Sequence, residues 1–248
     1  MSSAHGRWDA PVDGLLLDID DTLVDTRAAM CGAGVHAAQL LWPECGPGAH
    51  AAFSDRYYAD PGRFFDAYTR GGLTFEDMRR DRFEEARTFL GLPPGDFMVY
   101  ETAYRAVFRD CQRLFDDVVP FVRAIRDAGT PVVFLTNSGH DQTALKLSVT
   151  GLGELGEAVT TDTLGVGKPD PRVFAHACEL LGVSAARVVC VGDTLDADIL
   201  GARASGIRAA WIQRPGVPAP RDAGWGARVD DPGTRIVDSL AEVTALLA

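Results

Sequence analysis

Cysteine is used sparingly in this sequence and in no recognisable pairing pattern. The chain of 248 residues holds five cysteines, an odd number, and none of them stands in a C-x-x-C pair. A disulfide framework usually needs an even set, and a structural zinc site needs closely spaced ligands. The sequence therefore argues against both, and it favours free thiols in a reducing cytoplasm.

Long apolar runs are also missing. The first fourteen residues, MSSAHGRWDAPVDG, contain no apolar segment of the kind found in secretory signals. No uninterrupted apolar stretch approaches the roughly 20 residues that cross a bilayer. We therefore expect a cytoplasmic protein with no membrane partner, and nothing in the sequence indicates its oligomeric state.

Positive charge is in short supply. The chain carries 24 Lys and Arg against 35 Asp and Glu, which gives a formal net charge of -11. Such a chain repels phosphate backbones, so a nucleic-acid polymer is excluded as a partner. A small phosphorylated metabolite is still allowed, because one lysine and one bound cation can reverse the potential inside a cleft.

Strand patterns are absent from residues 24–117. Apolar and aromatic side chains recur there at helical spacing, and prolines and glycines divide the stretch into four or five helices. The length of the chain suits a core domain with a smaller inserted one. We predict an all-helical domain over residues 24–117, inserted into a core formed by residues 1–23 and 118–248.

The predicted core alternates short apolar runs with helical patterns. Continuous Val, Leu and Ile runs, each followed by a helix, are typical of a parallel sheet that is covered on both faces. The fold class is therefore predicted as α/β, a doubly wound, Rossmann-like parallel sheet. The predicted strands cover residues 14–18, 131–137, 157–160, 187–193 and 207–212.

The first predicted strand ends in a cluster of acids. Residues 15–23 read LLLDIDDTL, so an apolar run leads directly into Asp18, Asp20 and Asp21. An unpaired buried carboxylate is costly, and crowded carboxylates raise each other's pKa. Magnesium would relieve both penalties, because it prefers oxygen ligands. The motif indicates a metal-assisted site at the C-terminal edge of the sheet; the alternative is a strand that ends in a solvated acidic turn.

Two later segments have side chains that suit phosphate. The strand near residues 132–138 ends on Thr136 and Asn137, whose neutral groups can hold phosphate oxygens; the alternative is a helix N-cap, which Thr and Asn both favour. Lys168 lies in the loop GVGKPDP, where its charge can balance a carboxylate and a phosphoryl group. The alternative for Lys168 is an ordinary exposed loop lysine.

A second acidic strand end follows. Residues 188–202, VVCVGDTLDADILGA, place Asp193 at the end of a buried strand and Asp198 at the start of a helix. The helix dipole alone would favour an acid such as Asp198. It does not explain Asp193, which we interpret as a metal ligand. All four motifs are predicted at the same edge of the sheet.

This ordered set of motifs resembles the haloacid dehalogenase-like hydrolase superfamily. The helical insertion directly after the first motif is similar to the helical C1 cap of subfamily I, and AAWIQR (209–214) is similar to a late core segment of that subgroup. One departure is Ala197, where many members carry Asn, and it concerns the hydrogen bonding of Asp198 rather than the metal site. The residues that carry the resemblance are Asp18, Asp20, Thr22, Thr136, Lys168, Asp193 and Asp198.

The resemblance implies a role for each of these residues. Asp18 would be the nucleophile and form an aspartyl-phosphate, while Asp20 would serve the leaving group as an acid and the attacking water as a base. Mg²⁺ would bind the Asp18 carboxylate, the Asp20 backbone carbonyl and Asp193. The remaining residues would hold the phosphoryl group (Thr136 and Lys168) or support the site from behind (Thr22 and Asp198).

Asp20 also distinguishes the branches of the superfamily. Dehalogenases lack this second acid, because a halide leaves without a proton. Phosphonate-cleaving relatives lack it too and use a cap lysine, whereas residues 24–117 contain no lysine. The resemblance therefore implies a magnesium-dependent phosphatase for a small phosphomonoester, either a sugar phosphate or a nucleoside monophosphate. A phosphomutase of the same superfamily and a non-catalytic metabolite-binding protein are the alternatives.

The helical domain is expected to select the substrate. Residues 68–86 are similar to the caps of phosphatases that act on nucleoside monophosphates and sugar phosphates. Arg70, Arg79 and Arg82 are the candidates for binding a second anionic group of the substrate. The alternative is that they lie on a solvated helix face beside Glu84 and Glu85.

Overall fold

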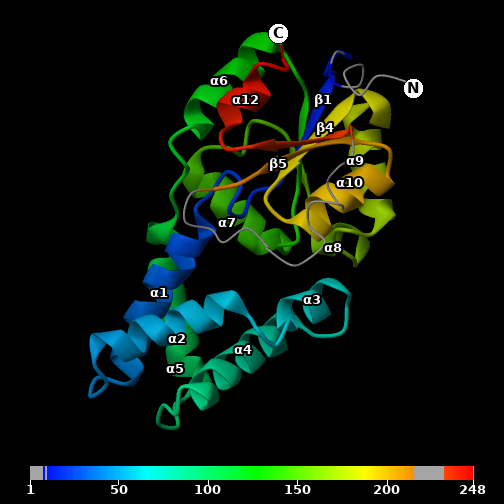
Figure 1. Cartoon of the computed structure of the whole chain (residues 1–248). Coiled ribbons are helices and arrows are strands. Elements are labelled where there is room, and N and C mark those ends of the chain that lie inside the picture. The colour runs from blue at the N-terminus through cyan, green and yellow to red at the C-terminus, as the bar shows by residue number, and fades with distance from the viewer. Residues whose placement is uncertain (1–7, 9, 215–231, 248) are drawn as a thin grey trace. The chain divides into compact units, whose positions relative to one another are not determined.

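A computed structural model describes residues 8, 10–214 and 232–247. The chain divides into two compact units, one formed by Met1–Val24 with Leu114–Ala248 and the other by Asp25–Arg113. The second unit is entirely helical in the structure (Figure 1). The sequence pattern put these boundaries at residues 23/24 and 117/118.

In its described residues, the first unit contains one parallel sheet of six strands in the order β3-β2-β1-β4-β5-β6. All five neighbouring pairs are parallel. This confirms the predicted fold class and adds one strand, β6, that the sequence pattern did not predict. The strands are β1 (Gly14–Leu17), β2 (Val132–Leu135), β3 (Glu157–Val159), β4 (Val188–Gly192), β5 (Arg208–Ile212) and β6 (Thr234–Val237).

Helices cover both faces of this sheet (Figure 1). Alternate side chains of a strand point to opposite faces, so Leu15 and Leu17 of β1 join one apolar cluster and Leu16 joins the other. The first cluster includes side chains of α6 (Val118–Ala128), α7 (His140–Thr150) and α12 (Leu240–Thr244), and the second those of α9 (Pro171–Leu181), η4 (Leu195–Leu200) and α10 (Gly201–Ala204). Two short elements, α8 (Thr161–Leu164) and η3 (Ala185–Arg187), complete the described part of this unit.

The helical unit is built around an aromatic core. The fully buried rings of Phe53, Phe83 and Tyr100 lie 5.1–5.7 Å apart, centroid to centroid. Contacts of this kind add to the apolar area that the helices bury. The elements of the helical unit are α1 (Thr26–Leu41), α2 (Pro47–Ala59), α3 (Phe64–Thr69), α4 (Phe75–Phe89), α5 (Phe97–Phe108) and η2 (Arg109–Cys111). None of the helices in the described part of the chain has both the length and the apolar character needed to cross a membrane.

The chain passes between the two units at two adjacent connections. Val24 forms an antiparallel bridge with Leu114, and the Phe115 amide donates to the Leu23 carbonyl at 3.1 Å. The outgoing and returning segments are therefore tied to each other close to the end of β1. The 89 residues of the helical unit, Asp25–Arg113, are therefore inserted at this point without interrupting the sheet of the first unit.

Candidate active site

The register of the central strands brings three sequence motifs to one edge of the sheet. Leu17 of β1 pairs with Phe134 of β2 and with Val191 of β4. Asp18 follows Leu17 directly, and its amide donates to the Val191 carbonyl at 2.9 Å. Because all strands are parallel, the residues after β1, β2 and β4 all leave the sheet at its C-terminal edge.

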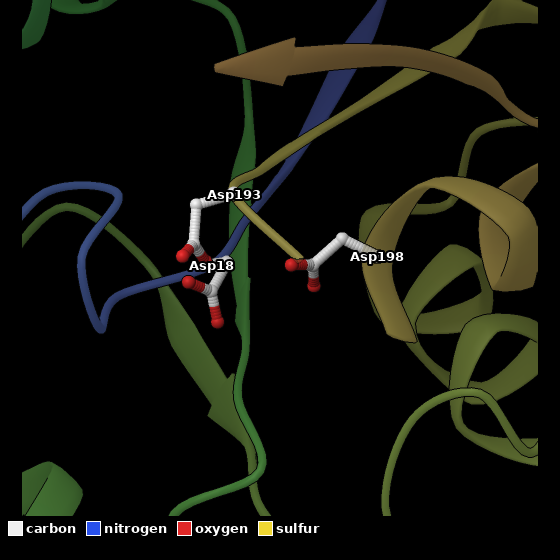
Figure 2. A group of neighbouring side chains, drawn as sticks. All are labelled: Asp18, Asp193 and Asp198. Atoms are coloured by element: carbon white, nitrogen blue, oxygen red, sulfur yellow. The ribbon is translucent and has the colours of Figure 1, made fainter. Parts of the chain in front are cut away.

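Three carboxylates meet at this edge. Asp18, Asp193 and Asp198 each offer an oxygen atom, and these atoms all lie within 4.8 Å of one another. Figure 2 shows Asp18 and Asp193 side by side at the strand ends, with the Asp198 carboxyl group reaching toward them from η4. The structure therefore brings together residues that are up to 180 positions apart in the sequence.

Lys168 supplies the positive charge of the cluster. Its Nζ donates to Oδ1 of Asp18 at 2.7 Å and to Oδ1 of Asp198 at 2.6 Å. The side chain is buried, and its pKa is raised, despite burial, by the two carboxylates. Lys168 is therefore a permanent ammonium ion in contact with the predicted nucleophile, and it is not an exposed loop lysine.

One ammonium ion does not balance this cluster. Burial raises the pKa of Asp18 to about 7, with Asp198 and Asp20 adding to the effect and Lys168 opposing it. Burial, Asp18 and Asp198 also raise the pKa of Asp193 well above its ordinary value. Such shifts indicate carboxylates that are short of a positive neighbour.

The donor set fits a magnesium ion. The clustered side chains offer oxygen atoms, which a hard divalent cation prefers. Both oxygens of Asp198 already accept hydrogen bonds, Oδ1 from Lys168 and Oδ2 from the Thr194 amide at 2.9 Å. Asp18 and Asp193 are therefore the carboxylates best placed to ligate a cation, and Asp198 holds the lysine.

Close approach of Asp198 depends on a glycine. A Cβ atom at Gly192, the last residue of β4, would collide with the carboxyl group of Asp198. The hydrogen bonds of Asp198 go to Lys168 and to the Thr194 backbone, so they do not involve residue 197. The Ala197 departure noted in the sequence thus leaves Asp198 with partners for both oxygens.

Asn137 holds the loop that carries Lys168. Its Nδ2 donates to the Lys168 carbonyl at 2.9 Å, and its Oδ1 accepts from the Lys168 amide at 2.6 Å. A Cβ at Gly167 would collide with this amide group. The side chain thus positions the lysine backbone, and its predicted contact with phosphate stays a prediction.

Asp20 has two partners that the sequence analysis did not identify. Ser138 Oγ donates to Oδ2 of Asp20 at 2.8 Å, and the Lys146 ammonium forms an ion pair with Oδ1. Lys146 lies on α7, and neither it nor Ser138 belongs to a strand-end acid motif. The helical spacing of α7 could have placed Lys146 on a buried face, but not beside Asp20.

Thr22 and Thr136 are both buried beside the site. The Thr22 carbonyl accepts a 3.1 Å hydrogen bond from Nε of Arg214, whose other branch pairs with Asp117 at 2.7 Å. The Thr136 hydroxyl accepts from the Ser138 amide at 3.1 Å. These contacts fix the chain immediately after β1 and β2, while the phosphate-binding role of Thr136 stays a prediction.

The three arginines predicted to select the substrate lie in different environments. Arg79 is buried and forms an ion pair with Glu101 at 2.7 Å. Arg82 is also buried and donates to the backbone carbonyls of α2. The solvated-face alternative is therefore wrong for these two, since both guanidinium groups hold the helical unit together. Arg70 is exposed at the end of α3, and its contact with substrate stays a prediction.

Comparison with known proteins shows relatives in both sequence and fold. A family model described as haloacid dehalogenase-like hydrolase matches residues 12–206. A phosphoserine phosphatase from Thermus thermophilus is 31% identical over 244 residues, which cover 88% of this chain and 95% of the relative. The similarity therefore extends over both units.

Solved structures share the fold at lower sequence identity. A HAD-hydrolase from Bacillus subtilis, YfnB, bound to magnesium, superposes with a TM-score of 0.73 at 21% identity, covering 96% of this chain and 99% of that chain. The L-2-haloacid dehalogenase PA0810 superposes with a TM-score of 0.72 at 24% identity, covering 95% and 98%. The fold is thus common to proteins named for different reactions, so the reaction of this chain has to be inferred from the residues of its site.

Proposed function

The chain belongs to the haloacid dehalogenase-like hydrolase family, and we propose that it is a magnesium-dependent phosphatase that cleaves a small phosphomonoester through an aspartyl-phosphate. The family and the phosphatase relative show a hydrolase of phosphoric monoesters. The metal, the intermediate and the substrate class, a sugar phosphate or a nucleoside monophosphate handled in the cytoplasm, are our proposals.

The observation that carries the proposal is the buried contact between Lys168 and Asp18. Phosphoryl transfer depends mainly on positioning and on neutralising the charge of the phosphoryl oxygens. A carboxylate can attack a phosphate dianion only where cations screen the repulsion between them. Lys168 provides one such cation at 2.7 Å from the attacking group, and a magnesium ion held by Asp18, the Asp20 carbonyl and Asp193 would supply the second.

The residues of the chain account for both halves of the reaction. An oxygen of Asp18 attacks phosphorus and the ester oxygen departs, taking a proton from Asp20. Asp20, now a carboxylate, then removes a proton from water, which attacks the aspartyl-phosphate and regenerates Asp18. Lys168 and Thr136 hold the oxygens of the transferred group throughout. Free phosphate and an alcohol are the products.

Asp20 argues against the dehalogenase reaction, although dehalogenases share the fold. A halide needs no proton to leave, whereas an alkoxide does. The structure gives Asp20 two dedicated partners, Ser138 and Lys146. A dehalogenase would have no use for an acid held in this way.

Metal removal provides the first test of the proposal. We expect phosphate release from a panel of sugar phosphates and nucleoside monophosphates to require Mg²⁺, and to fall by about 10³-fold or more in a chelator, the scale of several kcal/mol that a metal contributes to such reactions. Restoring Mg²⁺ should restore the activity. Equal rates with and without metal would contradict the proposal, and an isomerised sugar phosphate in place of free phosphate would indicate the mutase.

The role of Asp20 gives a second prediction. We expect Asp20→Asn to slow hydrolysis of an alkyl phosphate by about 10²- to 10³-fold, the usual range for a general acid, because its leaving group needs a proton. The loss should be much smaller for p-nitrophenyl phosphate, whose leaving group departs as a stable anion. Values of kcat/KM for phosphate release would measure both losses, because kcat/KM reports the steps up to the aspartyl-phosphate and leaves out its hydrolysis, which is the same for both esters. Equal losses for the two esters would remove the acid role from Asp20.

A further inference from the structure

Lysine is the rarest basic residue of this chain, and the structure places both copies at the active site. Of the 24 Lys and Arg residues, two are lysines, Lys146 and Lys168. Both side chains are buried, and each ammonium group contacts a carboxylate of the site. Lys168 belongs to the loop motif GVGKPDP, whereas Lys146 takes no part in the reaction steps proposed for Asp18 and Asp20.

The contacts of Lys146 converge on Asp20. Its Nζ pairs with Oδ1 of Asp20 and lies 3.3 Å from Oγ of Ser138, and that hydroxyl donates to Oδ2 of Asp20 at 2.8 Å. The three groups form a closed ring in which each oxygen of the Asp20 carboxyl group has its own donor. A carboxyl group that is held at both oxygens cannot rotate freely about its last bond.

From this geometry we infer that Lys146 is a positioning residue, which together with Ser138 orients the Asp20 carboxyl group for proton transfer to the leaving group. The inference rests on the proposed function, because it presupposes that Asp20 is the acid. Lys146 does not itself touch the reacting atoms. Its effect passes through the orientation of Asp20, so it should appear only in the steps in which Asp20 takes part.

A purely structural role does not account for a lysine at this position. The Lys146 side chain is 5% exposed, while its partner Asp20 is 28% exposed. The ammonium group is therefore removed from water although the carboxyl group that it contacts is still partly solvated. Burying a charge in this way is costly, and an apolar side chain of similar length would usually fold as well or better. Lys146 is also followed by Leu147, which already anchors α7 in the apolar core.

The first test separates positioning from structure by substrate. We expect Lys146→Met to lower kcat/KM, which reports the steps up to the aspartyl-phosphate, by about 30- to 100-fold for an alkyl phosphate and by less than about 5-fold for p-nitrophenyl phosphate. Ser138→Ala, which removes the second donor, should act in the same direction with a smaller loss. Lys146→Arg, which retains a cation, should recover part of the activity on the alkyl phosphate.

A double variant makes the test specific to Asp20. In an Asp20→Asn background, Lys146→Met should cause no more than about a 2-fold further loss, because residues that act through one group are not additive. Arg208→Met is the matched control: Arg208 is another buried cation of the same unit, but it donates to the carbonyls of Ala10 and Pro11. Its effect should be equal for the two esters and unchanged by Asp20→Asn. Equal losses of the two esters in Lys146→Met, or full additivity with Asp20→Asn, would overturn the inference.

A measurement that does not depend on turnover completes the test. Protein labelled with ¹⁵N-lysine has two side-chain ammonium groups, which Lys146→Arg assigns by removing one signal. We expect Asp20→Asn to shift or broaden the Lys146 signal by far more than the Lys168 signal. An unchanged Lys146 signal would overturn the inference even if the protein proves to be an active phosphatase. A wild-type protein without phosphatase activity but with this shift would instead refute the proposed function and leave the contact in place.

Discussion

Replacing Asp18 with asparagine is expected to abolish phosphatase activity and, at the same time, to stabilise the metal-free protein near pH 8. The loss of activity should reach about 10⁴-fold or more in kcat, the scale on which enzymes respond to removal of a nucleophile. The gain in stability has a different cause, because the Asp18 carboxylate is buried beside other acids. This one substitution should therefore lower catalytic activity and raise the stability of the metal-free protein, which separates the catalytic role of Asp18 from its effect on folding.

The sign of the stability effect follows from the pKa of Asp18. Burial, with Asp198 and Asp20, raises this pKa from 3.8 to about 7, although Lys168 lowers it. Between these two values the native state keeps a proton that the unfolded state has released. The stabilising contribution is therefore complete below about pH 4 and is lost as the pH rises through about 7. One pKa unit corresponds to about 1.4 kcal/mol, so ionising Asp18 costs the metal-free fold on the order of 4 kcal/mol at pH 8.

Unfolding by urea, in a chelator, measures this effect. We expect Asp18→Asn to raise the free energy of unfolding by about 2 kcal/mol at pH 8, less than the full cost because the neutral amide is a weaker partner for Lys168. The gain should shrink toward zero at pH 5, where Asp18 of the wild type is protonated. Mg²⁺ should stabilise the wild type much more than the variant.

Asp117 offers a control of opposite sign in the same unit. Although burial acts against it, hydrogen bonds from Arg214 and from the Leu240 amide hold the pKa of Asp117 below its ordinary value. Its contribution is present above the unfolded pKa and is lost as the pH falls, so Asp117→Asn should destabilise the protein at pH 8. A loss of stability in Asp18→Asn at pH 8 would contradict the electrostatic account of the site.

The architecture could be predicted from the sequence because most of its strands are short apolar runs that end at polar residues or glycine. The burial pattern of β1, β2, β4 and β5 leaves no exposed position to interrupt those runs. β6 was missed because it reads Thr-Arg-Ile-Val, with exposed residues among the four. A strand that is covered on one side only does not produce a continuous apolar signal.

The same logic explains which site residues could be predicted. Asp18, Asp193 and Lys168 stand where an apolar pattern is broken, so their sequence context already marks them as unusual. Lys146 stands inside an amphipathic helix, where a lysine is normally a solvated residue. Its importance depends on which side chain the fold places opposite it, a contact over 126 positions with no local signature. The burial of Arg79 has no local signature for the same reason, since its partner Glu101 lies on another helix.

The second large effect is expected at Lys168. Replacing it with methionine should lower kcat/KM by about 10³-fold or more and should destabilise the metal-free protein by about 3 to 5 kcal/mol at pH 8, the usual result of removing one partner from a buried ion pair. Lys168 is the shared partner of Asp18 and Asp198. Its loss leaves two buried carboxylates facing each other.

The pH dependence identifies the cause of that instability. Lys168 lowers the pKa of Asp18 both by its charge and by its hydrogen bond, so the pKa of Asp18 should rise further in Lys168→Met. The destabilisation should then be largest at high pH and should diminish as the solution is acidified toward pH 5. Urea unfolding across this range, in a chelator, would show it. A pH-independent loss would instead indicate poor packing of the new side chain.

A double variant separates the two functions of the lysine. Adding Asp198→Asn to Lys168→Met removes one of the two carboxylates that lost their partner, so we expect it to recover about half of the lost stability. It should recover no activity, because the phosphoryl group still lacks its ammonium partner. Lys168→Arg keeps the charge, and its stability should lie closer to the wild type. Activity that returned together with stability in the double variant would show that Lys168 serves only to hold Asp198, and the charge balance proposed for phosphoryl transfer would have to come from another group.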